Sequence, residues 1–189
     1  MTTAQKFLGE SVFLDMMTNP EFVKRIADWI IEAYIVLVKH FADLADVEVT
    51  SVHVGECSSC MVGSQLFGDF VVPGLNRIGE TLGPVRLHSC GQSDHVLETC
   101  RDNVPALCSL DIGGETSVAK IRRLFGRDFP ISIAPVVTDL SSDSPDAALC
   151  WLDRVLKDND GGNLTVLCHI EPEYSLKTLR SLYKKISSV

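Results

Sequence analysis

The stretch LFGDFVVPGLNRIGETLGPVRLHSCG, residues 66–91, joins a helical pattern to a strand pattern. Its first half places apolar residues at helical spacing, and Pro73 is expected to kink or split that helix. The run PVRLHSC, residues 84–90, is typical of a short strand. The stretch therefore predicts a helix–strand unit that carries His88 and Cys90 at the end of its strand.

The same alternation continues on both sides of this unit. Asn19 and Pro20 suit the N-cap and the first residue of a long amphipathic helix that ends near Phe41. Strands are predicted at 47–54, 84–90, 106–112, 131–137 and 163–170, and the helices that follow them at 64–80, 93–101, 115–125, 145–157 and 175–187. Five strands that are each followed by a helix imply right-handed crossovers and an α/β fold with a parallel sheet.

The composition is that of an ordinary globular protein. The chain has 189 residues, of which 46 % are apolar and 22 % are charged, enough for a single domain with a core. Its net charge of −8 argues against nucleic acid and anionic membranes as partners. We expect no membrane span and no secretion signal, because no apolar run has the required length or position.

Seven cysteines without a secretion signal favour a reducing cytoplasm over a disulfide framework. In that compartment, clustered cysteine and histidine residues indicate a metal site or catalysis. A lone cysteine is more often a small buried residue. On that ground Cys100, Cys108 and Cys150, which lie on apolar faces, are expected in the core.

The chemistry-bearing residues gather where the predicted strands end. Catalytic groups of parallel β/α folds collect at the carboxyl ends of the strands. These ends lie here at 55–57, 88–90, 109–111, 137–139 and 168–171. Three of them carry cysteine and two carry histidine, so one edge of the sheet holds most of the metal-binding side chains.

His88 and Cys90 are two positions apart on an extended segment, so both side chains point to one side. Zinc favours such thiolate and imidazole ligands, and catalytic zinc keeps three protein ligands with one position open. Cys168, at the end of the last strand, is the predicted third ligand, and Glu56 is a candidate labile fourth. The pattern alone leaves buried, unreactive thiols as an equal alternative.

The stretch 66–91 resembles the uroporphyrinogen decarboxylase superfamily, whose hallmark is a helix with Phe and Pro at this spacing and a strand ending in His-x-Cys-Gly. The segments 13–30, 41–59, 120–126 and 161–172 resemble further helices and strands of the same superfamily. The resemblance implies a TIM-type (β/α) barrel, of which this chain holds about strands 4 to 8 of 8.

His-x-Cys together with a late cysteine resembles one branch, the cobalamin-dependent methyltransferases that include the methylcobalamin:coenzyme M enzymes. The resemblance implies that His88, Cys90 and Cys168 bind a catalytic Zn²⁺. It also implies methyl transfer between a corrinoid, methylcobalamin carried by a partner protein, and a small thiol that is activated on zinc.

Three further residues receive roles in this interpretation. Glu56 is assigned the fourth metal position until the thiol displaces it. Asp111 and His169 are assigned the orientation of ligands or substrate by hydrogen bonds, although Asp111 suits a capping carboxylate equally well.

Residues 1–189 are therefore expected to form a single partial barrel domain. Five parallel strands leave two open edges, which are sticky unless they are covered. We expect a fragment, a partner chain with the N-terminal half-barrel, or a homodimer. The alternative functions are a catalytically incomplete half-barrel acting as a binding or regulatory subunit, and a uroporphyrinogen decarboxylase-like protein without metal.

Cys57 and Cys60 form a C-x-x-C motif between a strand and a helix. A helix N-terminus lowers the pKa of a thiol in such a motif, so disulfide redox chemistry is a further candidate function. The motif also lies near the predicted barrel mouth, where it is a candidate source of zinc ligands.

Overall fold

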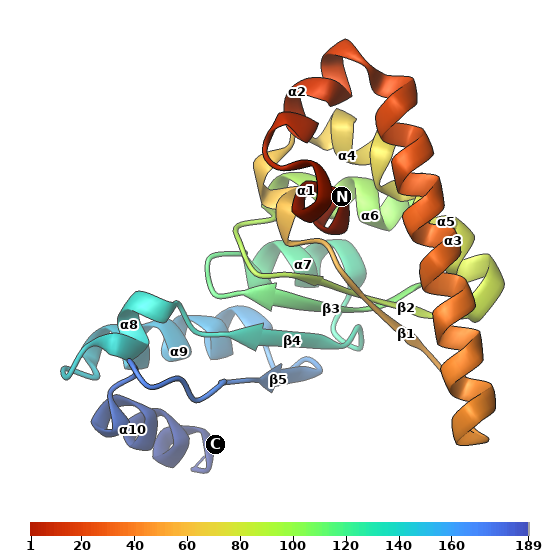
Figure 1. Cartoon of the computed structure of the whole chain (residues 1–189). Helices are drawn as coiled ribbons and strands as arrows, with labels where there is room; N and C mark the ends of the chain where they lie inside the picture. The colour runs from red at the N-terminus through yellow and green to blue at the C-terminus, as the bar shows by residue number, and fades with distance from the viewer. Residues whose placement is uncertain (189) are drawn as a thin grey trace. The chain divides into compact units, whose positions relative to one another are not determined.

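The computed structural model describes residues 1–188 and contains a five-stranded sheet whose strands follow chain order (Figure 1). The strands are β1 (Val52–Gly55), β2 (Val85–Ser89), β3 (Leu107–Gly113), β4 (Ile131–Ala134) and β5 (Leu164–Val166). β1 pairs in parallel with β2, and β4 pairs in parallel with β5. The predicted α/β fold with an incomplete barrel sheet is confirmed.

Helices precede the sheet and connect its strands. The α-helices are α1 (Thr2–Leu8), α2 (Ser11–Thr18), α3 (Pro20–Ala45), α4 (Ser64–Phe70), α5 (Val72–Leu82), α6 (Leu97–Asn103), α7 (Val118–Phe125), α8 (Val137–Ser141), α9 (Asp146–Asn159) and α10 (Leu176–Ile186). Two 3₁₀ helices, η1 (Cys57–Met61) and η2 (Asp94–Val96), follow β1 and β2. Among the helices of residues 1–188, none combines the length and the apolar character needed to cross a bilayer.

The predicted boundaries differ from the structure in a few places. The expected split at Pro73 is confirmed, because α4 ends at Phe70, three residues before that proline, and α5 begins at Val72, one residue before it. The first and last strands are shorter than predicted. The segment predicted to be strand up to residue 137 leaves the sheet after Ala134 and starts α8 at Val137.

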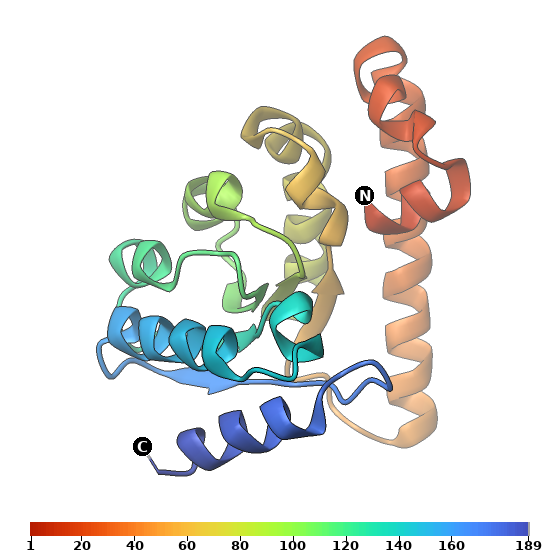
Figure 2. The same ribbon diagram turned by 90° about the vertical axis from the view of Figure 1, so that its left-hand side faces the viewer.

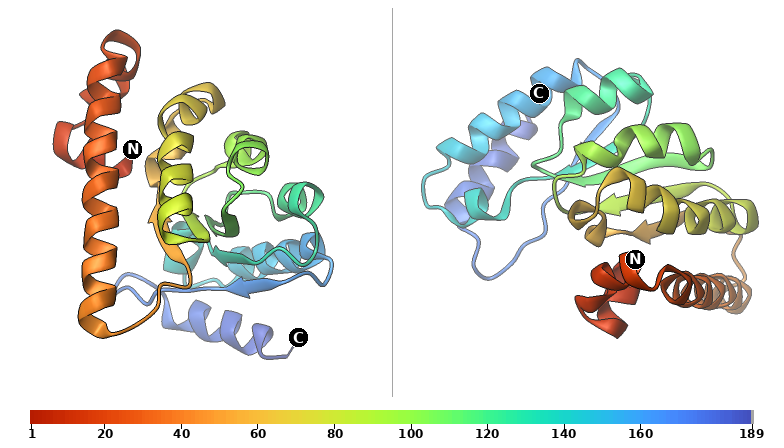
Figure 3. Two further views of the ribbon diagram at one scale, coloured as in Figure 1. Left: turned by 90° about the vertical axis from the view of Figure 1, so that its right-hand side faces the viewer. Right: turned by 90° about the horizontal axis from the view of Figure 1, so that it is seen from above.

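The chain divides into two compact units. The first comprises residues 1–89 and 95–110, and the second comprises residues 90–94 and those from 111 onward. In the first unit, α3 runs alongside α5 and contacts α1 and α2 (Figure 3). Gly74 on α5 allows this approach, because a Cβ there would lie 2.3 Å from Cδ1 of Ile31 on α3.

In the second unit, α9 contacts both α7 and α10 (Figure 2). Trp151, Leu152 and Val155 are the buried face of α9. Nε1 of Trp151 donates a hydrogen bond of 2.9 Å to the carbonyl oxygen of Gly114. This bond satisfies the indole donor inside the core, and it ties α9 to the turn that follows β3.

Arg122 is a buried charge at the base of the second unit. Its Nε donates to Oδ1 of Asn159 at 2.8 Å. Its two terminal nitrogens donate to the carbonyl oxygens of Gly126, Phe129 and Asn163 at 3.2, 2.6 and 2.6 Å. Burial lowers the pKa of the guanidinium, while the nearby charge of Asp128 raises it. One side chain thus joins α7, the end of α9 and the starts of β4 and β5.

We predict that Arg122→Met lowers the free energy of unfolding by roughly 2–4 kcal/mol, because it leaves several buried acceptors without a donor. Urea unfolding followed by circular dichroism measures the change. Arg123→Met, at the exposed neighbouring position of α7, is the matched control and should change stability by less than about 0.5 kcal/mol. Equal effects of the two substitutions would contradict the structural role of Arg122.

Candidate metal centre

The centre begins with the pairing of β1 and β2, which sets Gly55 opposite His88. The backbone N–H of Glu56 donates to the carbonyl oxygen of His88 at 2.8 Å, so the ladder extends one residue beyond β1. The imidazole of His88 lies beside that of His53, with ring centroids 5.7 Å apart. The loop after β1 is therefore bound directly to the residue predicted to be a metal ligand.

The C-x-x-C motif forms the 3₁₀ helix η1 and turns its serines inward. Ser58 and Ser59 are buried, whereas Cys57 is half-buried and Cys60 is exposed. Oγ of Ser59 donates to the carbonyl oxygen of Glu56 at 2.6 Å. The N–H of Ser58 donates to Oγ1 of Thr2 at 3.0 Å. The serines hold this turn in place, and both cysteine side chains stay outside the core.

His95, just before α6, closes the same turn from the other side. Its Nε2 lies 2.9 Å from the carbonyl oxygen of Val62 and 3.2 Å from that of Ser59. Two carbonyl acceptors require that Nε2 carries a proton, since carbonyl oxygens only accept. His95 thus holds the backbone of η1 and of Val62, the residue that follows it.

Two groups of three metal-ligating side chains occur within residues 1–188. Cys57, His88 and Cys90 form one group, and His53, His88 and Asp111 form the other. In each group the ligand atoms lie within 4.8 Å of one another. Tetrahedral zinc separates sulfur and nitrogen ligands by roughly 3.6 Å, so small side-chain rotations would bring either group into range. Two thiolates and an imidazole fit the preference of zinc well.

Cys168 lies after β5, and its S–H donates to the carbonyl oxygen of His169 at 3.2 Å. The residue is exposed as a whole, yet desolvation of its sulfur raises the pKa of the thiol. Within the described residues, Cys168 belongs to neither group of ligands. Its role as the third ligand stays a prediction, and so does the assignment of His169, which is exposed.

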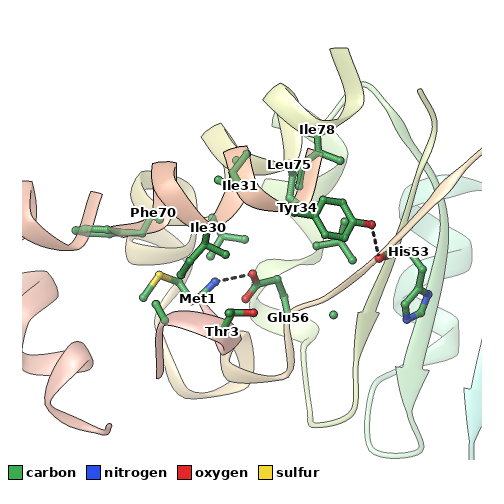
Figure 4. Close-up of a pocket in the computed structure, with 16 residues that line it drawn as sticks. Met1, Thr3, Ile30, Ile31, Tyr34, His53, Glu56, Phe70, Leu75 and Ile78 are labelled. Atoms are coloured by element: carbon green, nitrogen blue, oxygen red, sulfur yellow. Dashed lines mark hydrogen bonds and ion pairs between the residues drawn. The ribbon is translucent and has the colours of Figure 1, made fainter. Parts of the chain in front are cut away.

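Glu56 is buried, and its carboxylate already has partners. Oε1 lies 2.5 Å from the α-amino group of Met1 (Figure 4). Oε2 accepts the N–H of Thr2 at 3.1 Å. A labile metal bond from Glu56 would require it to leave these donors. Asp111 on β3 belongs to the group with both histidines, and its role beside His88 stays a prediction.

The three cysteines that were expected in the core differ in their burial. Cys100 on α6 is fully buried, and desolvation raises the pKa of its thiol to about 12. Cys108 is half-buried and donates to the carbonyl oxygen of Val85 at 3.3 Å. The prediction for Cys150 is wrong, because it is exposed on the side of α9 opposite Trp151 and Leu152.

A cavity of about 140 Å³ lies between α3, α5 and β1 in the first unit. Ile31, Leu75 and other apolar side chains line it (Figure 4). At its edge, the hydroxyl of Tyr34 donates to the carbonyl oxygen of His53 at 2.9 Å. Burial raises the pKa of this phenol. The outer edge of β1 is thus covered in part by α3, which reduces the stickiness expected of an open edge.

Comparison with known proteins shows the family to which the chain is similar. The uroporphyrinogen decarboxylase (URO-D) profile matches residues 5–128. The fold is similar to that of a methyltransferase from Methanosarcina mazei, with a TM-score of 0.74 and 16 % sequence identity. That similarity covers 99 % of this chain and 56 % of the methyltransferase, so the chain spans little more than half of its length. Comparison with curated protein sequences found no match.

We predict that Gly113→Ala disturbs the backbone of Cys90. A Cβ at Gly113, the last residue of β3, would lie 2.0 Å from the carbonyl oxygen of Cys90. The substitution should lower the free energy of unfolding by roughly 1–3 kcal/mol and weaken metal binding, because the clash is with backbone. Gly63→Ala is the matched control, since a Cβ there meets nothing within 4 Å. Thermal unfolding and zinc titration measure both effects, and an unchanged Gly113→Ala protein would contradict this packing.

Proposed function

Because the chain belongs to the uroporphyrinogen decarboxylase family, we propose that it is a zinc-dependent, methyltransferase-like domain acting between a corrinoid and a thiol. The observation that carries the proposal is the group of Cys57, His88 and Cys90, which sets two sulfur atoms and a ring nitrogen within 4.8 Å of one another. The fold shared with a methyltransferase supports the same reaction class.

His88 and Cys90 are the proposed metal ligands, with Cys168 as a third. A bound Zn²⁺ supplies charge that stabilises a substrate thiol as the thiolate near neutral pH. Two protein thiolates offset the charge of the ion, so the substrate sulfur keeps much of its nucleophilicity. When zinc and a methylated corrinoid are bound, the substrate thiol would lose its proton to water and its sulfur would take the methyl group, with the electron pair of the broken carbon–cobalt bond left on the corrinoid.

The other residues of the centre orient these groups. Asp111 is proposed to accept a hydrogen bond from His88, which fixes the tautomer of a ligating imidazole. Glu56 is proposed to approach the metal only when it leaves the α-amino group of Met1 and the N–H of Thr2. In this structure Glu56 instead connects α1 to the loop after β1, which supports a positioning role more directly than a ligand role.

The proposed partners are a corrinoid protein, a small thiol and a polypeptide that completes the barrel. Completion is supported by the coverage of 56 % of the related methyltransferase and by an apolar surface on α3. Exposed side chains of this surface are Trp29, Val36, Leu37, Phe41 and Leu44. A reducing compartment such as the cytoplasm suits the centre, because its thiols must stay reduced to bind metal.

A second candidate function is a catalytically incomplete half-barrel that binds metal or partner without turnover. The observation that favours it is the engagement of Glu56 with Met1 and Thr2, together with the position of Cys168 outside both ligand groups of the described residues. A decarboxylase-like protein without metal is the remaining alternative within the same family.

We predict that purified protein contains about one zinc per chain and that His88→Ala or Cys90→Ala removes most of it, because each takes away a ligand. Cys150→Ala, at an exposed cysteine on α9, is the control and should keep its zinc. Elemental analysis measures the content. A wild-type protein that neither contains zinc nor binds added zinc would contradict the proposal.

Methyl transfer from methylcobalamin to a small thiol, followed by the absorbance of the corrinoid, separates the two candidate functions. If the protein is an enzyme, we expect turnover that is lost in His88→Ala. The assay is run with this chain alone and with an added chain that supplies the remaining β/α units. Zinc binding without turnover in either condition would favour the binding subunit.

We predict that the chain associates at micromolar concentration, because α3 exposes several large apolar side chains. Native mass spectrometry should show dimers or larger species, and Trp29→Glu combined with Phe41→Glu should return the protein to monomer. A strictly monomeric wild-type chain would contradict the association.

A further inference from the structure

We propose that Cys57 is a ligand of the metal held by His88 and Cys90. This inference rests on the proposed zinc-dependent function and extends it to a residue of the C-x-x-C motif. The sulfur of Cys57 belongs to the same group of ligand atoms as His88, all within 4.8 Å of one another. Cys60, three residues later, belongs to no such group within residues 1–188.

The backbone places Cys57 at this position through a contact with the ligand residue itself. The N–H of Glu56, the residue before Cys57, donates to the carbonyl oxygen of His88 at 2.8 Å. A hydrogen bond of this length couples the two chain segments where both ligands leave them. Any movement of Cys57 away from His88 would first have to break this extension of the β1–β2 ladder.

Hydrogen bonds from three different segments hold the turn that η1 forms after Cys57. Ser59 donates inward to the carbonyl oxygen of Glu56, and its hydroxyl lies 3.2 Å from that of Ser89. The N–H of Ser58 donates to Thr2. His95 donates to the carbonyl of Val62 beyond the turn. A ligand fixed in this way loses little conformational entropy when it binds a metal, which raises affinity.

The same turn separates the roles of the two cysteines. The S–H of Cys60 donates to the carbonyl oxygen of Cys57 at 3.0 Å, and Cys60 is exposed. The structure therefore directs one thiol of the motif to the metal centre and the other to solvent. With Cys57 bound, residues 57–90 alone supply three ligands, so that Cys57 takes the place assigned to Cys168 and the fourth position remains for the substrate thiol.

Zinc affinity of the full chain, measured by competition with a chromophoric chelator, tests the assignment. Cys57→Ser should weaken zinc binding by at least about a hundredfold, because loss of a ligand exceeds the 10- to 100-fold effect of losing a supporting group. Cys60→Ser is the matched control in the same turn and should bind zinc as the wild type does. In the cobalt-substituted protein, Cys57→Ser should lower the sulfur-to-cobalt charge-transfer absorbance per bound ion, whereas Cys60→Ser should not.

Wild-type affinity in Cys57→Ser would overturn the assignment. The proposed function would survive that result if His88→Ala and Cys90→Ala still lost the metal. Equal losses in Cys57→Ser and Cys60→Ser would also overturn it, since they would trace the effect to the turn and not to the ligand. A wild-type chain without zinc affinity would remove the proposed function and this inference together.

Discussion

The centre depends on the hydrogen bond between the N–H of Glu56 and the carbonyl oxygen of His88. It continues the parallel pairing of β1 and β2 past the register of Gly55 with His88. In a parallel pair, the side chains of neighbouring strand ends come to one edge of the sheet. The pairing thus brings the start of η1 to the strand end that carries the His-x-Cys motif. Cys57 is the first residue of η1, so its thiol lies near His88.

Elements with strong local signals could be predicted from the sequence. Pro73 cannot continue a helix without losing a hydrogen bond, and α5 begins at Val72. Asn19 and Pro20 likewise mark the start of α3. The helices α1 and α2 escaped prediction because they are short and their N-cap residues, Met1 and Glu10, are not of the types that commonly cap helices. β1 is shorter than the predicted strand because only the last residues of that prediction pair with β2.

The metal centre was only half predictable. His88 and Cys90 could be found because they are two apart on a strand, a spacing that the sequence displays directly. The motif of Cys57 and Cys60 was expected near the barrel mouth, but the sequence did not distinguish the two cysteines, because the turn that separates their thiols depends on contacts that are distant in sequence. Thr2 is 56 residues from Ser58, and His95 is 33 residues from Val62. Such contacts leave no periodic trace, although the two serines between the cysteines are small polar residues that suit a hydrogen-bonded turn.

The proposed centre comes from one β-α-β segment, which has a consequence for a partial barrel. Cys57 and His88 both lie in the first compact unit, and the chain itself carries Cys90 two residues beyond His88. As proposed, the metal takes its ligands from this segment without a strand from the remainder of a barrel. Orientation of a thiol and access of a corrinoid are different requirements, because the strand ends of the whole mouth contribute to them. In the proposed function, metal affinity and turnover are therefore separable properties: residues 57–90 would supply the metal ligands, and turnover would also require the rest of the barrel mouth.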